Sequence, residues 1–218
     1  MKRIFVFVEG QTEETFVREI LYPYFSKKEI LITPKIAVTK RKRNGQVFRG
    51  GLTNYQKVRR DIVNLLYVSG INLITTMIDY YGLPESFPGK DHITNQNPFE
   101  KVKIIEEEFK KDINDPRFLP YLSLHEFEAI LFTSPLEISK ALLNRNSLEQ
   151  LTKITEQFNS PEEINDSPIT APSKRLRRIF PHYEKVVYGS LISKRIGLEA
   201  IRQKCTHFNQ WLEKLESI

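Results

Sequence analysis

Apolar runs typical of strands alternate with stretches of helical periodicity over residues 1–124. The first run, KRIFVFV at residues 2–8, is rich in β-branched and aromatic residues and predicts a buried strand. Similar runs predict further strands over residues 33–39, 72–78 and 118–124, the last one short or at a sheet edge because it contains Pro120. This alternation is typical of a mostly parallel sheet covered by helices.

Apolar residues recur at helical spacing between these runs, which predicts helices from residue 11 and over residues 52–69 and 98–111. Thr12 is the expected N-cap of the first helix. The Asn44-Gly45 and Gly50-Gly51 pairs predict turns in a flexible loop over residues 41–51. Residues 80–98 are rich in glycine and proline and are expected to form a long loop.

From His125 onward the pattern is helical almost to the end, apart from a polar stretch at residues 159–167. We therefore expect an α/β fold in which residues 1–133 form the α/β core. Residues 134–218 are expected to form a helical C-terminal subdomain packed on that core.

The chain has a single cysteine, Cys205, which excludes an intramolecular disulfide framework and a cysteine-rich zinc module. It falls in a helical pattern and is expected to be a packing thiol. The apolar run before Glu9 is too short for a signal peptide or a membrane span, so a cytoplasmic protein without membrane association is expected.

Positive charge is concentrated in two blocks of the sequence, within a net charge of +6. Residues 30–60 hold nine Lys or Arg and no acid, and residues 174–195 hold seven against one acid. Between residues 100 and 128 acids predominate. The two basic blocks fit phosphate neutralisation on a nucleic acid and fit a solvated basic surface equally well.

Acids stand at the ends of three predicted strands: Glu9, Asp79 and the pair Glu126/Glu128. Each alone is more typical of a solvated loop. Ligands of open α/β sheets bind at the carboxyl ends of strands, where these acids would meet. Because clustered carboxylates repel one another without a cation and Mg²⁺ prefers oxygen ligands, the pattern predicts a divalent-metal site for phosphate chemistry.

Three segments carry a resemblance to a known family. Residues 8–13 (VEGQTE) resemble the first motif of Toprim domains, a strand that ends in Glu-Gly before a helix. DYYGLP at residues 79–84 with FPG at 87–89, and HEFEAILF at residues 125–132, resemble the second and third motifs of one Toprim-like family of unknown function. This family includes AriB, the nuclease component of the PARIS phage-defence system. The match extends to PSKRL at 172–176 and YEK at 183–185.

The resemblance implies a Toprim-like sheet and assigns roles at matching positions. Glu9 would ligate metal or act as general acid or base, and Asp79 would be the first aspartate of an Asp-x-Asp pair. Tyr81 stands where that pair has its second aspartate, so Glu126 or Glu128 would replace the missing ligand. On a helix these two lie about 200° apart and only one would face the metal, whereas on an extended strand they share a face. We favour Glu126 and keep Glu128 open.

Neighbouring residues have two readings each. His125 fits a general base or a capping or packed residue. Glu13 and Glu14 fit the first turn of a helix, where they interact favourably with its dipole, and Glu13 is also a weaker candidate for supporting the metal ligands. Lys185 is a candidate for stabilising the transition state, or an exposed charge.

Two groups of residues are candidates for contacts with nucleic acid. The first group belongs to a predicted helix start with a basic face, which can bind a phosphate, and comprises Ser173, Lys174, Arg175 and Arg178. The loop at residues 40–51 fits a clamp on the backbone in which Phe48 stacks on a base, and its basic members are Lys40, Arg41, Lys42, Arg43 and Arg49. The alternatives are an exposed charge run and an ordinary surface loop.

The leading hypothesis is a metal-dependent Toprim-family nuclease in which Glu9, Asp79 and Glu126 hold one or two Mg²⁺ (or Mn²⁺) ions. The family resemblance implies an antiphage effector that an AAA-type ATPase partner controls and that is toxic when released. Its substrate would be RNA, tRNA included, or DNA. A homodimer is the expected active state. The alternatives are a non-catalytic subunit that binds nucleic acid or a partner through a degenerate site, and a small-molecule phosphohydrolase or nucleotidyltransferase.

Overall fold

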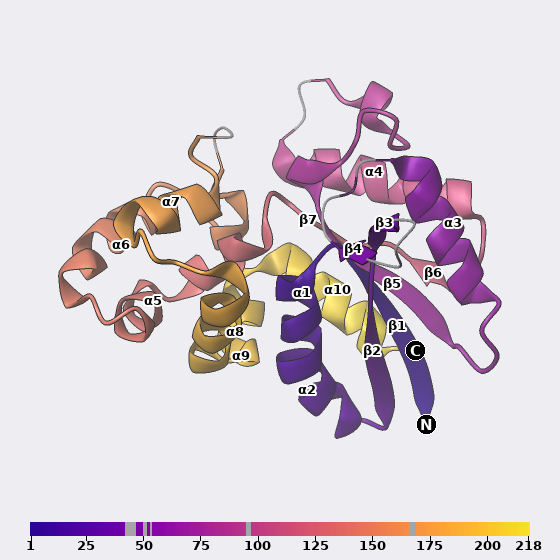
Figure 1. The fold of residues 1–218 in the computed structure, drawn as a ribbon, viewed down its shortest axis with the longest axis horizontal. Coiled ribbons are helices and arrows are strands. Elements are labelled where there is room, and N and C mark those ends of the chain that lie inside the picture. Colours follow the sequence, from indigo (N-terminus) through magenta and orange to yellow (C-terminus); the bar gives the residue numbers. More distant parts are fainter. Residues whose placement is uncertain (42–46, 50–51, 53, 95–96, 166–168) are drawn as a thin grey trace. The chain divides into compact units, whose positions relative to one another are not determined.

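The computed structural model describes residues 1–218 except 42–46, 50–51, 53, 95–96 and 166–168. Contacts divide the chain into two compact units (Figure 1). The first unit comprises Met1–Leu124 with Glu216–Ile218, and the second comprises His125–Leu215. The domain boundary expected after residue 133 stays a prediction.

A five-stranded sheet forms the centre of the first unit. Its strands are β1 (Lys2–Val8), β2 (Ile30–Ile36), β5 (Leu73–Asp79), β6 (Phe118–Leu119) and β7 (Leu122–Ser123). The order is β2-β1-β5-β6, β7 also pairs with β5, and every pairing is parallel. The expected mostly parallel sheet is therefore confirmed.

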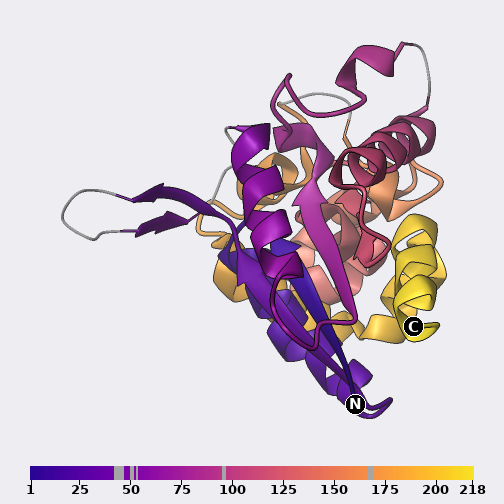
Figure 2. The same ribbon diagram turned by 90° about the vertical axis from the view of Figure 1, so that its right-hand side faces the viewer.

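Helices cover this sheet, as the α/β pattern predicts. They are α1 (Gln11–Phe16), a π-helical turn η1 (Val17–Leu21), α2 (Tyr22–Ser26), α3 (Tyr55–Leu66) and α4 (Pro98–Ile113), with short 3₁₀ turns η2 (Tyr80–Gly82) and η3 (Lys90–His92). Phe5 and Phe7 of β1 share a core with Ile62 of α3 and Ile105 of α4. Figure 2 shows α3 lying along the long strands of this sheet.

The first helix differs from the expectation at its start. Gly10 is the N-cap instead of Thr12, and Glu13 accepts a hydrogen bond from the Gly10 amide. A π-helical turn, which contains more residues per turn than an α-helix, follows at Val17–Leu21, and the buried apolar side chains of this segment are Phe16, Val17, Leu21 and Phe25.

The predicted loop over residues 41–51 is wrong in part, because β3 (Val38–Arg41) pairs antiparallel with β4 (Val47–Arg49). β-prone residues on both sides of an Asn-Gly pair are the sequence signal of a hairpin, and this signal outweighs the basic run. The predicted strand 33–39 is likewise divided between β2 and β3. The turns expected at Asn44-Gly45 and Gly50-Gly51 lie outside the described residues.

The last strand is divided at Pro120 into β6 and β7, and β6 is short and lies at the sheet edge, as its sequence predicts. The side chain of Thr76 in β5 replaces the missing ladder bonds: its hydroxyl donates to the Tyr121 carbonyl at 2.7 Å and accepts from the Tyr121 amide at 2.9 Å. The strand therefore resumes as β7 beside the end of β5.

The second unit is helical, which confirms the expectation for the chain after His125. Its elements are η4 (Phe127–Thr133), α5 (Pro135–Ala141), η5 (Arg145–Ser147), α6 (Leu148–Thr155), η6 (Pro161–Glu163), α7 (Pro172–Ile179), α8 (Lys185–Ile196), α9 (Leu198–Lys204) and α10 (Thr206–Glu216). The 3₁₀ segment η4 is buried, and α7, α8 and α9 contact it. Cys205 is also buried, which raises the pKa of its thiol and keeps it neutral.

None of the helices in the described part of the chain is long and apolar enough to cross a membrane.

Glu162 caps the N-terminal end of α10 from a buried position. Its carboxylate accepts hydrogen bonds from the amides of His207 and Phe208, both at 3.0 Å. Because Glu162→Ala leaves these donors without an acceptor, we expect the free energy of unfolding to fall by about 2–3 kcal/mol. Urea unfolding of the complete chain measures this loss. The control is Glu163→Ala, whose carboxylate accepts one bond at an exposed site, and an equal loss in both variants would contradict the assignment.

Candidate functional site

Glu9 and Asp79 lie at the same edge of the sheet, on adjacent strands. Val8, the last residue of β1, pairs with Met77 of β5 in parallel register. Glu9 therefore follows the end of β1 where Asp79 ends β5. Both residues are partly exposed. The strand register thus brings these two acids to the same carboxyl edge of the sheet, where they were expected.

Gly82 brings the backbone of the second motif against the carboxylate of the first. A Cβ atom built at Gly82 would lie 3.5 Å and 3.7 Å from the two carboxylate oxygens of Glu9. The turn η2, which begins directly after Asp79, therefore passes beside Glu9 without a side chain at the closest point. The Oε2 atom of Glu9 is buried at this point.

Glu13 organises the loop between Glu9 and the first helix. It is buried, and its Oε2 accepts a hydrogen bond from the Gly10 amide at 2.9 Å. A Cβ at Gly10 would lie 3.3 Å from the same oxygen, so a glycine suits this close approach. Glu13 thus acts on the position of residue 10, which agrees with a structural role at the helix start.

The donor set at this edge suits a hard cation in number and kind. Mg²⁺ is usually held by one or two carboxylates, with water and substrate phosphate completing its ligands. Glu9 and Asp79 provide two carboxylates at this edge. Within the residues that the structure describes, no group of three or more His, Cys, Asp or Glu residues is placed to hold a metal.

The second unit contains its own charged cluster, formed by Glu126, Glu128 and Lys185. The Lys185 ammonium lies 3.1 Å from Glu128 and 3.9 Å from Glu126 Oε1. Only 1% of the Glu128 side chain is exposed, compared with 33% of the Lys185 side chain. Glu126 has extended backbone angles and precedes η4, so the two glutamates reach one lysine and the helical separation of about 200° does not apply.

The start of α7 is occupied by one of these carboxylates. Glu126 Oε2 accepts a hydrogen bond from the Ser173 amide at 3.0 Å. That amide, expected to grip a phosphate, is engaged by a carboxylate in this structure. Lys174 and Arg178 are exposed on α7, whereas Arg175 donates to the Thr170 carbonyl.

Tyr183 lies beside the same carboxylates. Only 3% of this residue is exposed, and no partner for its hydroxyl is found among the described residues. Burial raises the pKa of Tyr183, and the charges of Glu128 and Glu126 raise it further. The hydroxyl therefore stays protonated and is available as a donor next to two carboxylates.

The predicted site residues thus fall into two groups, one in each unit. Glu9 and Asp79 meet in the first unit, and Glu126, Glu128 and Lys185 meet in the second. His125 is buried. The nucleic-acid candidates Lys40 and Arg41 belong to β3 and Arg49 to β4, while Lys42 and Arg43 lie outside the described residues.

Sequence reasoning did not single out Gly82 or Tyr183. The signal for Gly82 was its place three residues after a strand-ending aspartate. Tyr183 stands in the YEK segment that extends the family match, but its place next to Glu126 and Glu128 depends on burial.

We expect Gly82→Ala to leave the fold intact, since its Cβ would make ordinary contacts. The added methyl group would lie 3.5 Å and 3.7 Å from the two Glu9 oxygens and crowd an ion bound there, so Mn²⁺ affinity should fall about tenfold or less. Titration calorimetry with Mn²⁺ measures the change, and Glu9→Gln provides the reference loss. Unchanged affinity in Gly82→Ala alongside a clear loss in Glu9→Gln would show that this side of the carboxylate is not used.

Lys185→Met removes the cation that neutralises buried Glu128. We expect a loss of about 2 kcal/mol in the free energy of unfolding, below the value for a fully buried pair because Lys185 is partly exposed. The double variant Lys185→Met/Glu128→Gln should recover most of the loss, since no buried charge is left. Exposed Lys174→Met is the control. A double variant as unstable as the single one would show that the loss does not come from the unpaired charge of Glu128.

Comparisons with known proteins give one family and several structural similarities. The chain is similar to the C-terminal region of the Burkholderia pseudomallei OLD protein, with 12% identity over 99% of each chain and a TM-score of 0.44. It is also similar to the C-terminal region of the Xanthomonas campestris pv. campestris OLD protein phased with iodine, with 13% identity, 100% of this chain and 99% of that chain covered, and a TM-score of 0.40. No curated protein matches. The family model described as "Domain of unknown function (DUF4276)" matches residues 8–216, and the chain therefore belongs to this family.

Proposed function

We propose that the chain is a metal-dependent Toprim-family nuclease that hydrolyses phosphodiester bonds in nucleic acid. The observation that carries this proposal is the meeting of Glu9 and Asp79 at the carboxyl edge of adjacent parallel strands, with Gly82 beside the Glu9 carboxylate. The order of the three motifs in the sequence supports it, because each of these acids stands at a position where the Toprim resemblance expects it.

In this proposal Glu9 and Asp79 hold Mg²⁺ or Mn²⁺ through their carboxylate oxygens. When bound, the ion would polarise a phosphoryl oxygen and lower the pKa of a bound water. Glu13 holds the Gly10 amide in place and so orients the backbone next to Glu9. Gly82 brings the backbone of the second motif beside the Glu9 carboxylate with no side chain between them.

The third motif contributes further roles to the proposal. Glu126 is assigned as an additional metal ligand, with Glu128 as the alternative, and Lys185 as the group that stabilises the negatively charged transition state. Their shared contacts support a joint role, since Glu128 holds the ammonium group and the Ser173 amide holds Glu126. Tyr183 adds a protonated hydroxyl beside them.

The biological setting in this proposal is a cytoplasmic antiphage effector that an AAA-type ATPase partner controls, active as a homodimer on RNA, tRNA included, or on DNA. It rests on the family resemblance. The two basic blocks of the sequence support a polyanionic substrate through phosphate neutralisation.

The test compares wild type with Glu9→Gln and Asp79→Asn on labelled tRNA, single-stranded DNA and duplex DNA, in Mg²⁺, Mn²⁺ and EDTA. Wild type should cleave one substrate class only with metal, and each variant should lose about a hundredfold or more in rate. Glu14→Gln, which alters a partly exposed carboxylate of the same helix start, is the matched control. Mn²⁺ titration of the same proteins detects the site even if cleavage requires the ATPase partner.

A specific observation favours one competing function, a non-catalytic binding subunit. Tyr81 occupies the position of the second aspartate and is 47% exposed, so it offers no carboxylate at that edge. Metal binding and cleavage that persist in both Glu9→Gln and Asp79→Asn would overturn the proposed centre. Nucleic-acid binding without metal affinity in wild type would establish the binding subunit instead.

A further inference from the structure

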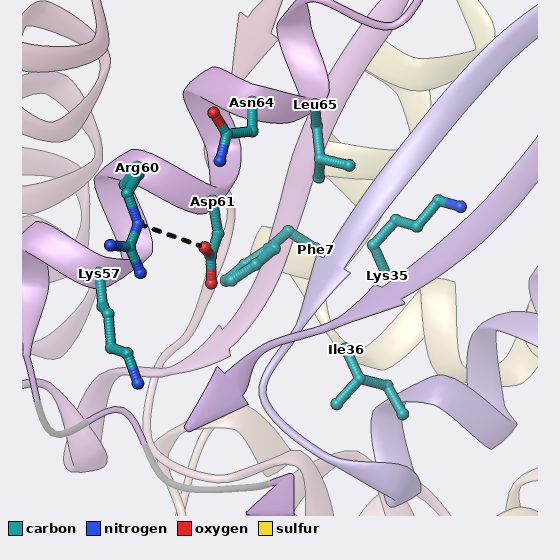
Figure 3. A pocket seen from close by; sticks show the side chains of 8 residues that line it. All are labelled: Phe7, Lys35, Ile36, Lys57, Arg60, Asp61, Asn64 and Leu65. Atoms are coloured by element: carbon teal, nitrogen blue, oxygen red, sulfur yellow. Dashed lines mark ion pairs between the residues drawn. The ribbon is translucent and has the colours of Figure 1, made fainter. Parts of the chain in front are cut away.

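A pocket of about 580 Å³ lies between α3 and the edge strand β2 of the first unit (Figure 3). Three apolar side chains line it: Phe7 of β1, Ile36 of β2 and Leu65 of α3. Phe7 is 2% exposed and belongs to the core, so this part of the lining is rigid. The pocket therefore offers a firm apolar surface at the border of the sheet.

Cations stand on both sides of this apolar surface. Lys57 and Arg60 come from α3, and Lys35 comes from β2 across the pocket (Figure 3). The Lys35 ammonium lies 4.5 Å from the centre of the Phe5 ring, a contact that orients it. The positive charges on the two sides derive from the block of residues 30–60 that contains no acid.

One acid, Asp61, also lines the pocket. Its Oδ1 lies 4.0 Å from Arg60 Nε, and both side chains are partly exposed. An ion pair at this distance and exposure is weak, so the Arg60 guanidinium is easily drawn to a stronger anion. Counting Asp61 against Lys35, Lys57 and Arg60, the lining has a positive balance.

A rigid apolar surface bordered by cations suits one unit of an unpaired nucleic-acid strand. Arginine and lysine pair with phosphate, and apolar atoms pack against an exposed base or sugar. In a duplex the faces of the bases are stacked inside, where Ile36 and Leu65 do not reach them. The chemistry of the pocket thus favours a single strand.

The pocket lies at the same edge of the sheet as Glu9. Phe7 precedes Glu9 by two residues in the chain, and Ile36 pairs with Val8 in the parallel register. We propose that this pocket binds one nucleotide of a single-stranded nucleic acid, with the phosphate at Lys57 and Arg60, next to the Glu9 centre. Its use in positioning a substrate strand rests on the proposed function, whereas binding itself does not.

The test measures binding by fluorescence anisotropy with short fluorescein-labelled single-stranded RNA, single-stranded DNA and duplex DNA in EDTA, across a salt series. Lys57→Gln/Arg60→Gln should weaken single-strand binding about tenfold and reduce the salt slope by about 1.4, or 0.7 for each lost phosphate contact. The matched control Lys103→Gln/Lys110→Gln removes two exposed lysines from α4 and should change affinity less than about twofold.

A second pair of variants tests the pocket without removing any cation. Asn64→Asp adds a carboxylate to the exposed pocket wall, and Gln56→Glu adds one elsewhere on α3. Single-strand affinity should fall several-fold in the first and stay near wild type in the second. Equal effects in the two members of either pair would overturn the proposal.

Duplex DNA that binds as tightly as the single strand, and is weakened as much by the pocket variants, would overturn the single-strand assignment. The RNA and DNA arms show which sugar is preferred. Binding in EDTA and the metal-dependent cleavage lost in Glu9→Gln are independent readouts. If Glu9→Gln loses cleavage but the pocket variants bind normally, the pocket proposal alone is refuted. If the pocket variants lose binding but Glu9→Gln still cleaves, the nuclease proposal alone is refuted.

Discussion

The parallel pairing of β1 with β5 is the constraint on which the candidate centre depends. In this register Val8 lies opposite Met77, so the ends of both strands reach the same edge and bring Glu9 near Asp79. A shift of one residue would also turn Phe5 and Phe7 away from the core that they share with α3 and α4. Burial of these aromatic side chains thus holds the register, and the register holds the two acids together.

Buried charge organises the second unit in a different way. Glu128 is almost completely enclosed, and its negative charge is compatible with burial because Lys185 lies 3.1 Å away. Glu126 is satisfied by the Ser173 amide, which ties the segment before η4 to the start of α7. The same contacts that make these carboxylates tolerable also hold Lys185 in place, so stability and the proposed catalytic role share the same residues.

Much of the fold and part of the candidate site follow from local sequence. β1 and β5 are apolar runs whose burial requires a sheet, and α3 and α4 show the period of helices with one apolar face. The two acids at the strand ends are predictable because parallel strands bring their carboxyl ends to one edge. The N-cap at Gly10 and the π-helical turn at residues 17–21 depend on small energy differences between neighbouring backbone hydrogen-bond patterns, which the sequence pattern does not resolve. The pairing of β3 with β4 depends on contact between two short runs.

By itself, the sequence determined the α/β alternation, the helical second half, and the acids Glu9 and Asp79 at the carboxyl ends of β1 and β5. Helical or strand period and residue type act within a few neighbouring positions, so a local pattern records them. Only the tertiary structure decided that Gly82 approaches Glu9, that Glu126 and Glu128 share Lys185, and that Lys35, Lys57 and Arg60 line one pocket. These contacts join residues far apart in the chain. Their distances follow from how whole strands and helices pack, which no local pattern records.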